Sequence, residues 1–326
     1  MKKLTVLLLL SLFALTLVGC GKNAAGEADD GLYDDLIVVG FSQVGAESDW
    51  RAANTKSMQE ALSEANGYKL IFDDAQQKQE RQITAIRNFV QQEVDYIVLA
   101  PTTETGWDTV LQEAKTAGIP IIIVDRMIEV EDDSLFTCWI GSDFRKEGDT
   151  AVQWLAQRFV NTPVNIVHLQ GNLGSTAQIG RTESLDAGLR KHENWTLLAR
   201  ESGEFTQAKG QEVMESFLEQ RHDFNVVFSE NDNMTYGAID ALEAVGLKPG
   251  KDVVVVSFDA NRKALEMTLD GQINCNIECN PLHGPRVQAI IQQLEAGEMP
   301  QKFTYVEETA FYAETITREI IDNREY

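Results

Sequence analysis

The feature that most constrains the fold is a regular alternation of short apolar runs with segments of helical periodicity. Helical segments such as 51–65 and 79–92 place their apolar side chains on one face. The strand-like runs fall into two series, 36–40, 69–72, 96–100, 119–124 and 137–140, then 165–169, 196–200, 225–229, 253–257 and 273–278. Strand–helix alternation of this kind predicts parallel sheets with right-handed crossovers.

Two series of about five units predict two domains rather than one very wide sheet. We therefore expect an α/β protein with two Rossmann-like, doubly wound lobes, a hinge and a central cleft. An eight-stranded α/β barrel is the alternative, but it fits the ten runs and the late extra crossings poorly. A helical run at 286–294 and a closing strand at 303–308 suggest that the chain returns to the first lobe. The expected lobes are 36–142 with 280–307, and 143–279 with 308–326.

The first 20 residues have the pattern of a targeting segment. Lys2 and Lys3 precede an apolar stretch that is short for a membrane span and ends in Leu-Val-Gly-Cys20. We interpret 1–20 as a lipoprotein signal peptide with Cys20 as the lipidated residue, and the small, polar 21–35 as a flexible tether. An ordinary signal peptide with a chance cysteine, or a single anchor helix, is the alternative. The expected location is extracytoplasmic, with a lipid anchor in the cell membrane.

Charge and cysteine content limit the partners. The formal net charge is −23, and such an acidic surface repels phosphate backbones, so nucleic acid is not expected as a partner. Cys275 and Cys279 lie on one predicted strand about 13 Å apart, too far for a disulfide or a shared metal ion. We expect Cys138, Cys275 and Cys279 to be buried free thiols, and we expect no metal and no cofactor.

Polar and aromatic side chains follow the predicted strands, where open α/β sheets bind their ligands. Arginine and carboxylate groups can bind vicinal hydroxyls, and aromatic rings can cover the apolar face of a sugar ring. The candidate sugar-binding residues are Gln43, Ser48, Trp50, Arg51, Asp125, Arg126, Arg181, Phe205, Asn231, Asp259 and Glu278. Core packing of Trp50 and an internal Asp125–Arg126 ion pair are the alternatives. Asp143 and Ser175 are expected to be helix N-caps.

Signals of catalysis are weak. The four histidines are scattered, and the sequence contains neither His-Glu-x-x-His nor Gly-x-Ser-x-Gly. The Gly-rich segment 171–175 has neither dinucleotide-binding nor P-loop spacing. We therefore expect a binding protein rather than an enzyme.

Several longer phrases carry a resemblance to a known family. They include Val-Gly-Phe-Ser-Gln-Val-Gly at 39–45, Trp-Arg-Ala-Ala at 50–53, Gly-Glu-Phe-Thr at 203–206 and Gly-Leu-Lys-Pro-Gly-Lys-Asp at 246–252. From Val38 onward the chain resembles the type I periplasmic sugar-binding proteins of ABC transporters, which include the ribose- and galactose-binding proteins. Within that family it is most similar to the galactofuranose-binding members, and Gln43 and Arg51 belong to the phrase shared with them.

The resemblance implies a monomer whose two lobes close over a monosaccharide. Trp50 and Phe205 would stack on the ring, while Asp125, Arg126 and Arg181 would bind its hydroxyls. Asn231, Asp259 and Glu278 would contribute from the second lobe or the hinge. The implied function is capture of a sugar, galactofuranose or another furanose, for an ABC permease. A sensor that presents its closed form to a receptor or histidine kinase stays open as the alternative, whereas a DNA-binding repressor is disfavoured by the export signal.

Overall fold

The computed structural model describes residues 36–220 and 223–326. The predicted signal peptide, Cys20 and the tether at 21–35 lie outside these residues. The strands are β1 (Ile37–Gln43), β2 (Tyr68–Asp74), β3 (Tyr96–Leu99), β4 (Ile121–Val124), β5 (Cys138–Gly141), β6 (Val164–Gln170), β7 (Trp195–Ser202), β8 (Val226–Ser229), β9 (Val254–Asp259), β10 (Cys275–Glu278), β11 (Phe303–Tyr305) and β12 (Ala310–Tyr312). The helices are α1 (Asp49–Ala61), α2 (Gln79–Gln91), α3 (Asp108–Thr116), α4 (Phe144–Arg158), α5 (Thr176–Lys191), α6 (Gln207–Glu219), α7 (Asp232–Ala244), α8 (Arg262–Leu269), α9 (Gly284–Glu295) and α10 (Arg318–Asp322), with short 3-10 turns η2 (Glu64–Asn66) and η3 (Asp133–Leu135).

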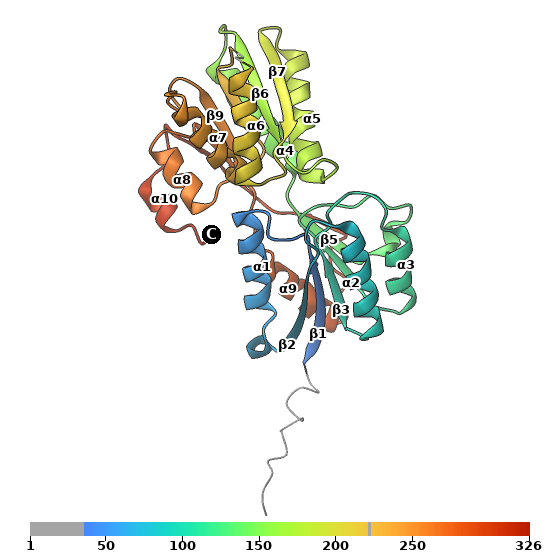
Figure 1. The fold of residues 1–326 in the computed structure, drawn as a ribbon. Helices are drawn as coiled ribbons and strands as arrows, with labels where there is room; N and C mark the ends of the chain where they lie inside the picture. Colours follow the sequence, from blue (N-terminus) through green and yellow to red (C-terminus); the bar gives the residue numbers. More distant parts are fainter. Residues whose placement is uncertain (1–35, 221–222) are drawn as a thin grey trace, which may run out of the picture. The chain divides into compact units, whose positions relative to one another are not determined.

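The strands form two separate six-stranded sheets, each accompanied by helices (Figure 1). The first has the order β11-β5-β4-β3-β1-β2, and all its strand pairs are parallel. The second has the order β12-β10-β9-β8-β6-β7, in which β12 alone among the described strands is antiparallel to its neighbour. The predicted two-lobed, doubly wound α/β class is therefore confirmed.

The chain passes between the sheets three times. The crossings lie between β5 and α4, between β10 and α9, and between β11 and β12. The return to the first sheet is anchored by α9, which packs against α1. The crossings fall where the lobe boundaries near 142, 279 and 307 were expected, and we keep these boundaries as our proposal for the lobes.

Some element ends differ from their expected positions. The strand expected from 119 begins at Ile121 because Pro120 has no N–H to give to the ladder; its carbonyl instead accepts from Ile97 N. The helix expected over 51–65 ends at Ala61, and η2 then closes on Gly67 in the left-handed region. The expected strand 303–308 ends at Tyr305, and β12 was not predicted because three residues carry too little pattern.

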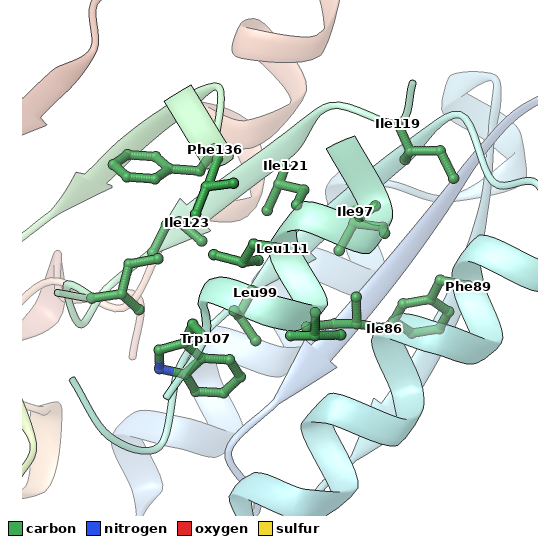
Figure 2. Close-up of a cluster of buried hydrophobic side chains, with 14 of the residues drawn as sticks. Ile86, Phe89, Ile97, Leu99, Trp107, Leu111, Ile119, Ile121, Ile123 and Phe136 are labelled. Atoms are coloured by element: carbon green, nitrogen blue, oxygen red, sulfur yellow. The ribbon is translucent and has the colours of Figure 1, made fainter. Parts of the chain in front are cut away.

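Alternating strand residues build the core of the first sheet on both of its faces. Ile97 and Leu99 point to one face and pack against α2 and α3, whereas Val98 points to the other face, toward α1 and α9. Figure 2 shows the first of these clusters, with Trp107 fully buried in it. Burial on both faces explains why these strands read as continuous apolar runs.

Other local predictions agree with the structure. Asp143 and Ser175 are N-caps, accepting from Lys146 N and Gln178 N respectively. Cys138, Cys275 and Cys279 are buried free thiols. Within 36–220 and 223–326, no helix combines the length and the apolar character that crossing a bilayer requires.

Candidate ligand-binding site

A cavity lies at the carboxyl ends of the strands of both sheets. Its empty space, together with the open solvent at its mouth, amounts to about 290 Å³. Its lining is Glu47, Ser48, Trp50, Arg51, Asp125 and Arg126 from the first sheet's side, and Phe144, Ala177, Arg181, Phe205, Asn231, Asp259 and Cys279 from the second sheet's side. Aromatic rings and a few charged side chains line the cavity together, as they do in sites for small polar ligands.

The cavity brings together nine of the eleven candidate residues. They are Ser48, Trp50, Arg51, Asp125, Arg126, Arg181, Phe205, Asn231 and Asp259. The other two lie outside its lining. The Gln43 carboxamide oxygen accepts from Arg51 Nη1 at 3.1 Å, and Glu278 accepts from Arg324 Nη1 at 2.6 Å and from the hydroxyl of Tyr326 at 3.0 Å. Gln43 thus supports Arg51, and Glu278 fastens the carboxyl-terminal segment.

The beginning of α1 positions Trp50 and Arg51. Ser48 caps the helix by accepting from Arg51 N, which turns both side chains toward the cavity. The Trp50 indole Nε1 donates to the carbonyl of Cys279 at 2.6 Å, and the Arg51 guanidinium lies 4.5 Å from the centre of the indole ring. Trp50 therefore lines the cavity and is also part of a buried apolar cluster that includes Phe205.

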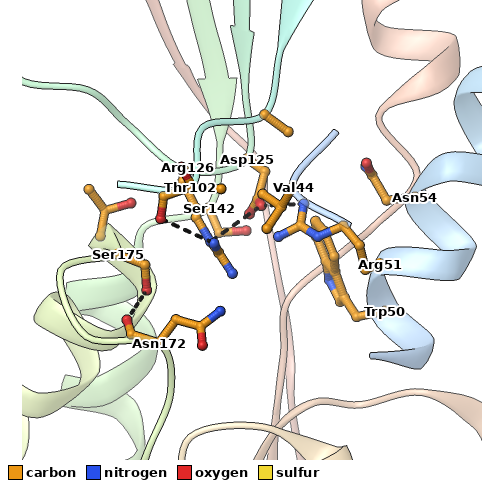
Figure 3. A network of polar contacts seen from close by, with 12 residues as sticks. Val44, Trp50, Arg51, Asn54, Thr102, Asp125, Arg126, Ser142, Asn172 and Ser175 are labelled. Carbon is orange, nitrogen blue, oxygen red and sulfur yellow. Dashed lines mark hydrogen bonds and ion pairs between the residues drawn. The ribbon is translucent and has the colours of Figure 1, made fainter. Parts of the chain in front are cut away.

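Arg51 has close partners on two sides. Its Nη1 lies 2.8 Å from Asp125 Oδ2 (Figure 3). Its Nε lies 3.2 Å from Glu47 Oε1. Burial lowers the pKa of Arg51, but the two carboxylates outweigh this effect and leave the pKa above its usual value. Arg51 is thus held by the protein itself.

Arg126 is buried with longer contacts. Its Nη2 lies 3.4 Å from Glu47 Oε1, and its Nη1 lies 3.5 Å from the carbonyl of Thr102. Burial, together with the neighbouring Arg51 cation, lowers the pKa of Arg126 to about 10. Its guanidinium lies 5.4 Å from the centre of the Phe205 ring. Arg126 thus keeps hydrogen-bond donors that a ligand in the cavity can use.

Arg181 enters the cavity from α5. Its Nε donates to Glu147 Oε2 at 2.7 Å, its Nη1 donates to the carbonyl of Glu230 at 2.5 Å, and its Nη2 lies 3.8 Å from Asp259 Oδ1. Burial raises the pKa of Asp259 well above its usual range, against the opposing effect of Arg181. The lining carries three guanidinium groups against the three carboxyl groups of Glu47, Asp125 and Asp259.

Three lining residues have a strained backbone. Asp125, Phe205 and Asp259 have φ values of 64°, 59° and 99°, in the left-handed region. Each such conformation costs about 1–3 kcal/mol and persists where the surrounding structure enforces it. The strain falls at the ends of strands or just beyond them, where it aims side chains into the cavity. This distribution is typical of a functional site.

Two glycines make these positions possible. A Cβ at Gly171 would stand 1.9 Å from Cζ of Phe205, and a Cβ at Gly141 would stand 2.1 Å from the carbonyl oxygen of Asp125. Both are closer than any van der Waals contact, so a side chain at either position would displace a cavity residue.

Four lining residues were not predicted: Glu47, Phe144, Ala177 and Cys279. Glu47 directly precedes Ser48, and Cys279 directly follows Glu278, so extending the strand-end rule by one residue would have found both. Phe144 and Ala177 lie in the first turns of α4 and α5, one and two residues after the predicted caps Asp143 and Ser175. The signal that would have found them is that the N-termini of these helices face the edge of the sheet where the strands end.

Comparison with known proteins identifies the family. A model described as the periplasmic binding protein domain matches residues 39–311. The chain belongs to the periplasmic binding protein family. This confirms the predicted family, whose members bind solutes outside the cytoplasm and catalyse no reaction.

Three relatives illustrate the similarity. The galactofuranose-binding protein YtfQ of Escherichia coli is 39% identical over 288 residues, which cover 87% of this chain and 90% of that protein. A Mycobacterium smegmatis structure in complex with β-D-fucofuranose is 43% identical, with a TM-score of 0.82 over 85% of this chain and 92% of that one. The binding component of an arabinose ABC transporter from Shewanella sp. ANA-3, bound to L-arabinofuranose, is 41% identical, with a TM-score of 0.84 over 88% of this chain and 95% of that one.

Proposed function

We propose that this periplasmic binding protein captures a neutral furanose monosaccharide, galactofuranose or a close analogue, and delivers it to an ABC permease. One observation carries the proposal: the cavity combines three aromatic rings, Trp50, Phe144 and Phe205, with guanidinium and carboxyl groups in equal number. The formal charges of these groups cancel, which favours an uncharged ligand. The three relatives described above are named for furanoses, which supports this sugar class.

Hydrogen bonds between the two sides of the cavity suggest how sugar binding is coupled to closure of the lobes. Atoms from both sides of the cavity bond directly: Asp49 N donates to Asn233 Oδ1 at 3.0 Å, and Met127 N donates to Thr176 Oγ1 at 3.1 Å. A sugar that contacts both lobes at once binds the closed form better than the open form and so shifts the population toward closure. The closed form would then be the one that docks on the permease.

The lipid anchor is a separate part of the proposal. Cys20, at the end of the lipoprotein-like signal, would carry more than one acyl chain and so hold the mature protein on the membrane. More than one chain is needed because a single chain binds only marginally. Fractionation tests it: wild-type protein should sediment with membranes, and a Cys20→Ser variant should lose the anchor. Equal sedimentation of both proteins would contradict lipidation at Cys20.

Binding is tested by calorimetric titration of the purified protein with a panel of neutral sugars, including D-galactose and L-arabinose. Uptake of the bound sugar, compared in cells with and without the gene for this protein, tests delivery. Loss of sugar uptake when the gene for this protein is deleted supports a transport role. Normal uptake together with loss of a sugar-induced transcriptional response would favour the sensor alternative.

A further inference from the structure

The three connections between the sheets meet at one carboxyl group, that of Glu308. Glu308 lies on the third connection, between β11 and β12. Its Oε1 accepts from the hydroxyl of Ser142, on the first connection, at 2.6 Å, and from the backbone N of Asn280, on the second connection, at 2.7 Å. One oxygen atom therefore joins all three segments that any movement between the lobes must bend.

A second carboxyl group, that of Glu147, stands next to this junction. Glu147, Cys279 and Glu308 each place one polar side-chain atom within 4.8 Å of the others. Glu147 is 3% exposed. Its Oε2 accepts from Arg181, whereas its Oε1 is buried and has no hydrogen-bond partner among the described residues. Two adjacent carboxylates with an unpaired buried oxygen are unfavourable unless one of them carries a proton.

The hydrogen-bond pattern indicates where the proton resides. Oε1 of Glu308 accepts two hydrogen bonds, as a carbonyl oxygen does, which leaves its other oxygen to carry the hydrogen. A protonated Glu308 can then donate to Oε1 of Glu147, which keeps Glu147 ionised opposite Arg181.

We propose that Glu308 is a protonated positioning residue, which ties the three connections together and holds Glu147 so that Glu147 orients Arg181 at the ligand cavity. This proposal rests on the proposed sugar-binding function, because Arg181 matters only if the cavity binds a ligand. It extends that function because one proton, on Glu308, links the three connections between the lobes to Arg181 at the cavity.

The charges around the pair are consistent with this arrangement. Burial and the neighbouring Glu147 raise the pKa of Glu308 to about 9. Burial raises the pKa of Glu147 to about 7, against the lowering effect of Arg181. The other titratable or charged groups facing the pair are Asp143 and Lys146 on or beside α4, Asp259 on β9, Glu278 and Cys279 at the end of β10, and Arg286 on α9.

The sign of the pH effect follows from proton linkage. The proposal requires that the closed form, with the two carboxyl groups adjacent, holds the shared proton more tightly than the open form does. Sugar affinity should therefore be retained at neutral pH and fall as the pH rises through about 9, where Glu308 ionises. For each unit by which the pKa of Glu308 differs between the two forms, we expect sugar affinity to fall on the order of tenfold.

Three variants test the proposal. Glu308→Gln mimics the protonated acid, since its amide can donate to Glu147 and its carbonyl can accept from Ser142 and Asn280. It should bind sugar as tightly as wild type at pH 7 and show a smaller alkaline loss. Glu308→Ala should bind sugar about tenfold more weakly than wild type at pH 7 and also at alkaline pH. The neighbouring, exposed Glu307→Gln serves as the matched control and should behave like wild type.

An infrared measurement separates failure of this proposal from failure of the proposed function. A protonated-carboxyl band should be present at pH 7 without any sugar, weaken in Glu308→Gln and persist in Glu307→Gln. An equally strong band in Glu308→Gln and in Glu307→Gln would overturn the proposal. Sugar binding by Glu308→Gln as weak as that of Glu308→Ala at pH 7 would also overturn it. Sugar affinity that falls on treatment with a chelator would also overturn it, because the pair would then hold a cation. If no sugar binds the wild type, the proposed function fails and the infrared result still decides the protonation of Glu308.

Discussion

The guanidinium of Arg51 lies 2.8 Å from the carboxylate of Asp125, whereas Arg126, the next residue in the chain after Asp125, has no described carboxylate contact shorter than 3.4 Å. The two arginines therefore differ in role although both line one cavity. Arg51 orients Asp125 and Glu47, and Arg126 retains donors for a ligand. Asp125 can in turn accept from a sugar hydroxyl while it remains paired with Arg51.

Arg126→Ala should weaken sugar binding by about 2–4 kcal/mol, because it removes a charged donor and leaves buried acceptors unpaired. Calorimetric titration measures this loss. Arg145→Ala, at an exposed arginine on α4, is the matched control and should leave the affinity unchanged. Full affinity in a folded Arg126→Ala variant would show that Arg126 serves only as an internal ion-pair partner.

Gly171→Ala should weaken sugar binding by about 1–3 kcal/mol, since its Cβ would overlap the Phe205 ring and displace it. Binding and thermal unfolding should be measured side by side. The double variant Gly171→Ala, Phe205→Leu relieves the overlap and should regain stability without regaining affinity. Recovery of affinity in the double variant would mean that the Phe205 ring does not contact the sugar.

His283 should make the fold sensitive to acid. Burial lowers the pKa of His283 from 6.5 to about 4, so the folded protein resists its protonation. The unfolded chain binds this proton first, and stability falls as the pH drops from about 6.5 to 4, by at most about 3 kcal/mol. Urea unfolding across this range should show a smaller decline for His283→Leu than for wild type. His192→Leu is the control, and equal declines in all three proteins would contradict a role for His283.

Much of the site follows from the sequence because parallel strands end at one edge of a sheet. The β-branched runs located the strands, and the polar residues after them, such as Asp125 and Asn231, converge for that reason. Caps such as Asp143 were predictable because the pattern is local.

What could not be predicted depends on contacts between distant segments. Glu278 follows a strand as the other candidates do, but Arg324 and Tyr326, nearly 50 residues further along the chain, occupy its carboxylate. The separate roles of Arg51 and Arg126 depend on the distance of each from Glu47 and Asp125, which no local pattern contains. The junction at Glu308 likewise requires three connections to meet, and only the folded chain shows that they do.

The central claim is that the cavity between the sheets binds one neutral furanose. Calorimetric titration of the wild-type protein with D-galactose, L-arabinose and the matching uronic acids tests it most directly. We predict one sugar per chain, an affinity near micromolar, which corresponds to about −8 kcal/mol, and no binding of the charged acids. No heat with any neutral sugar, or preferential binding of an acid, would contradict the claim.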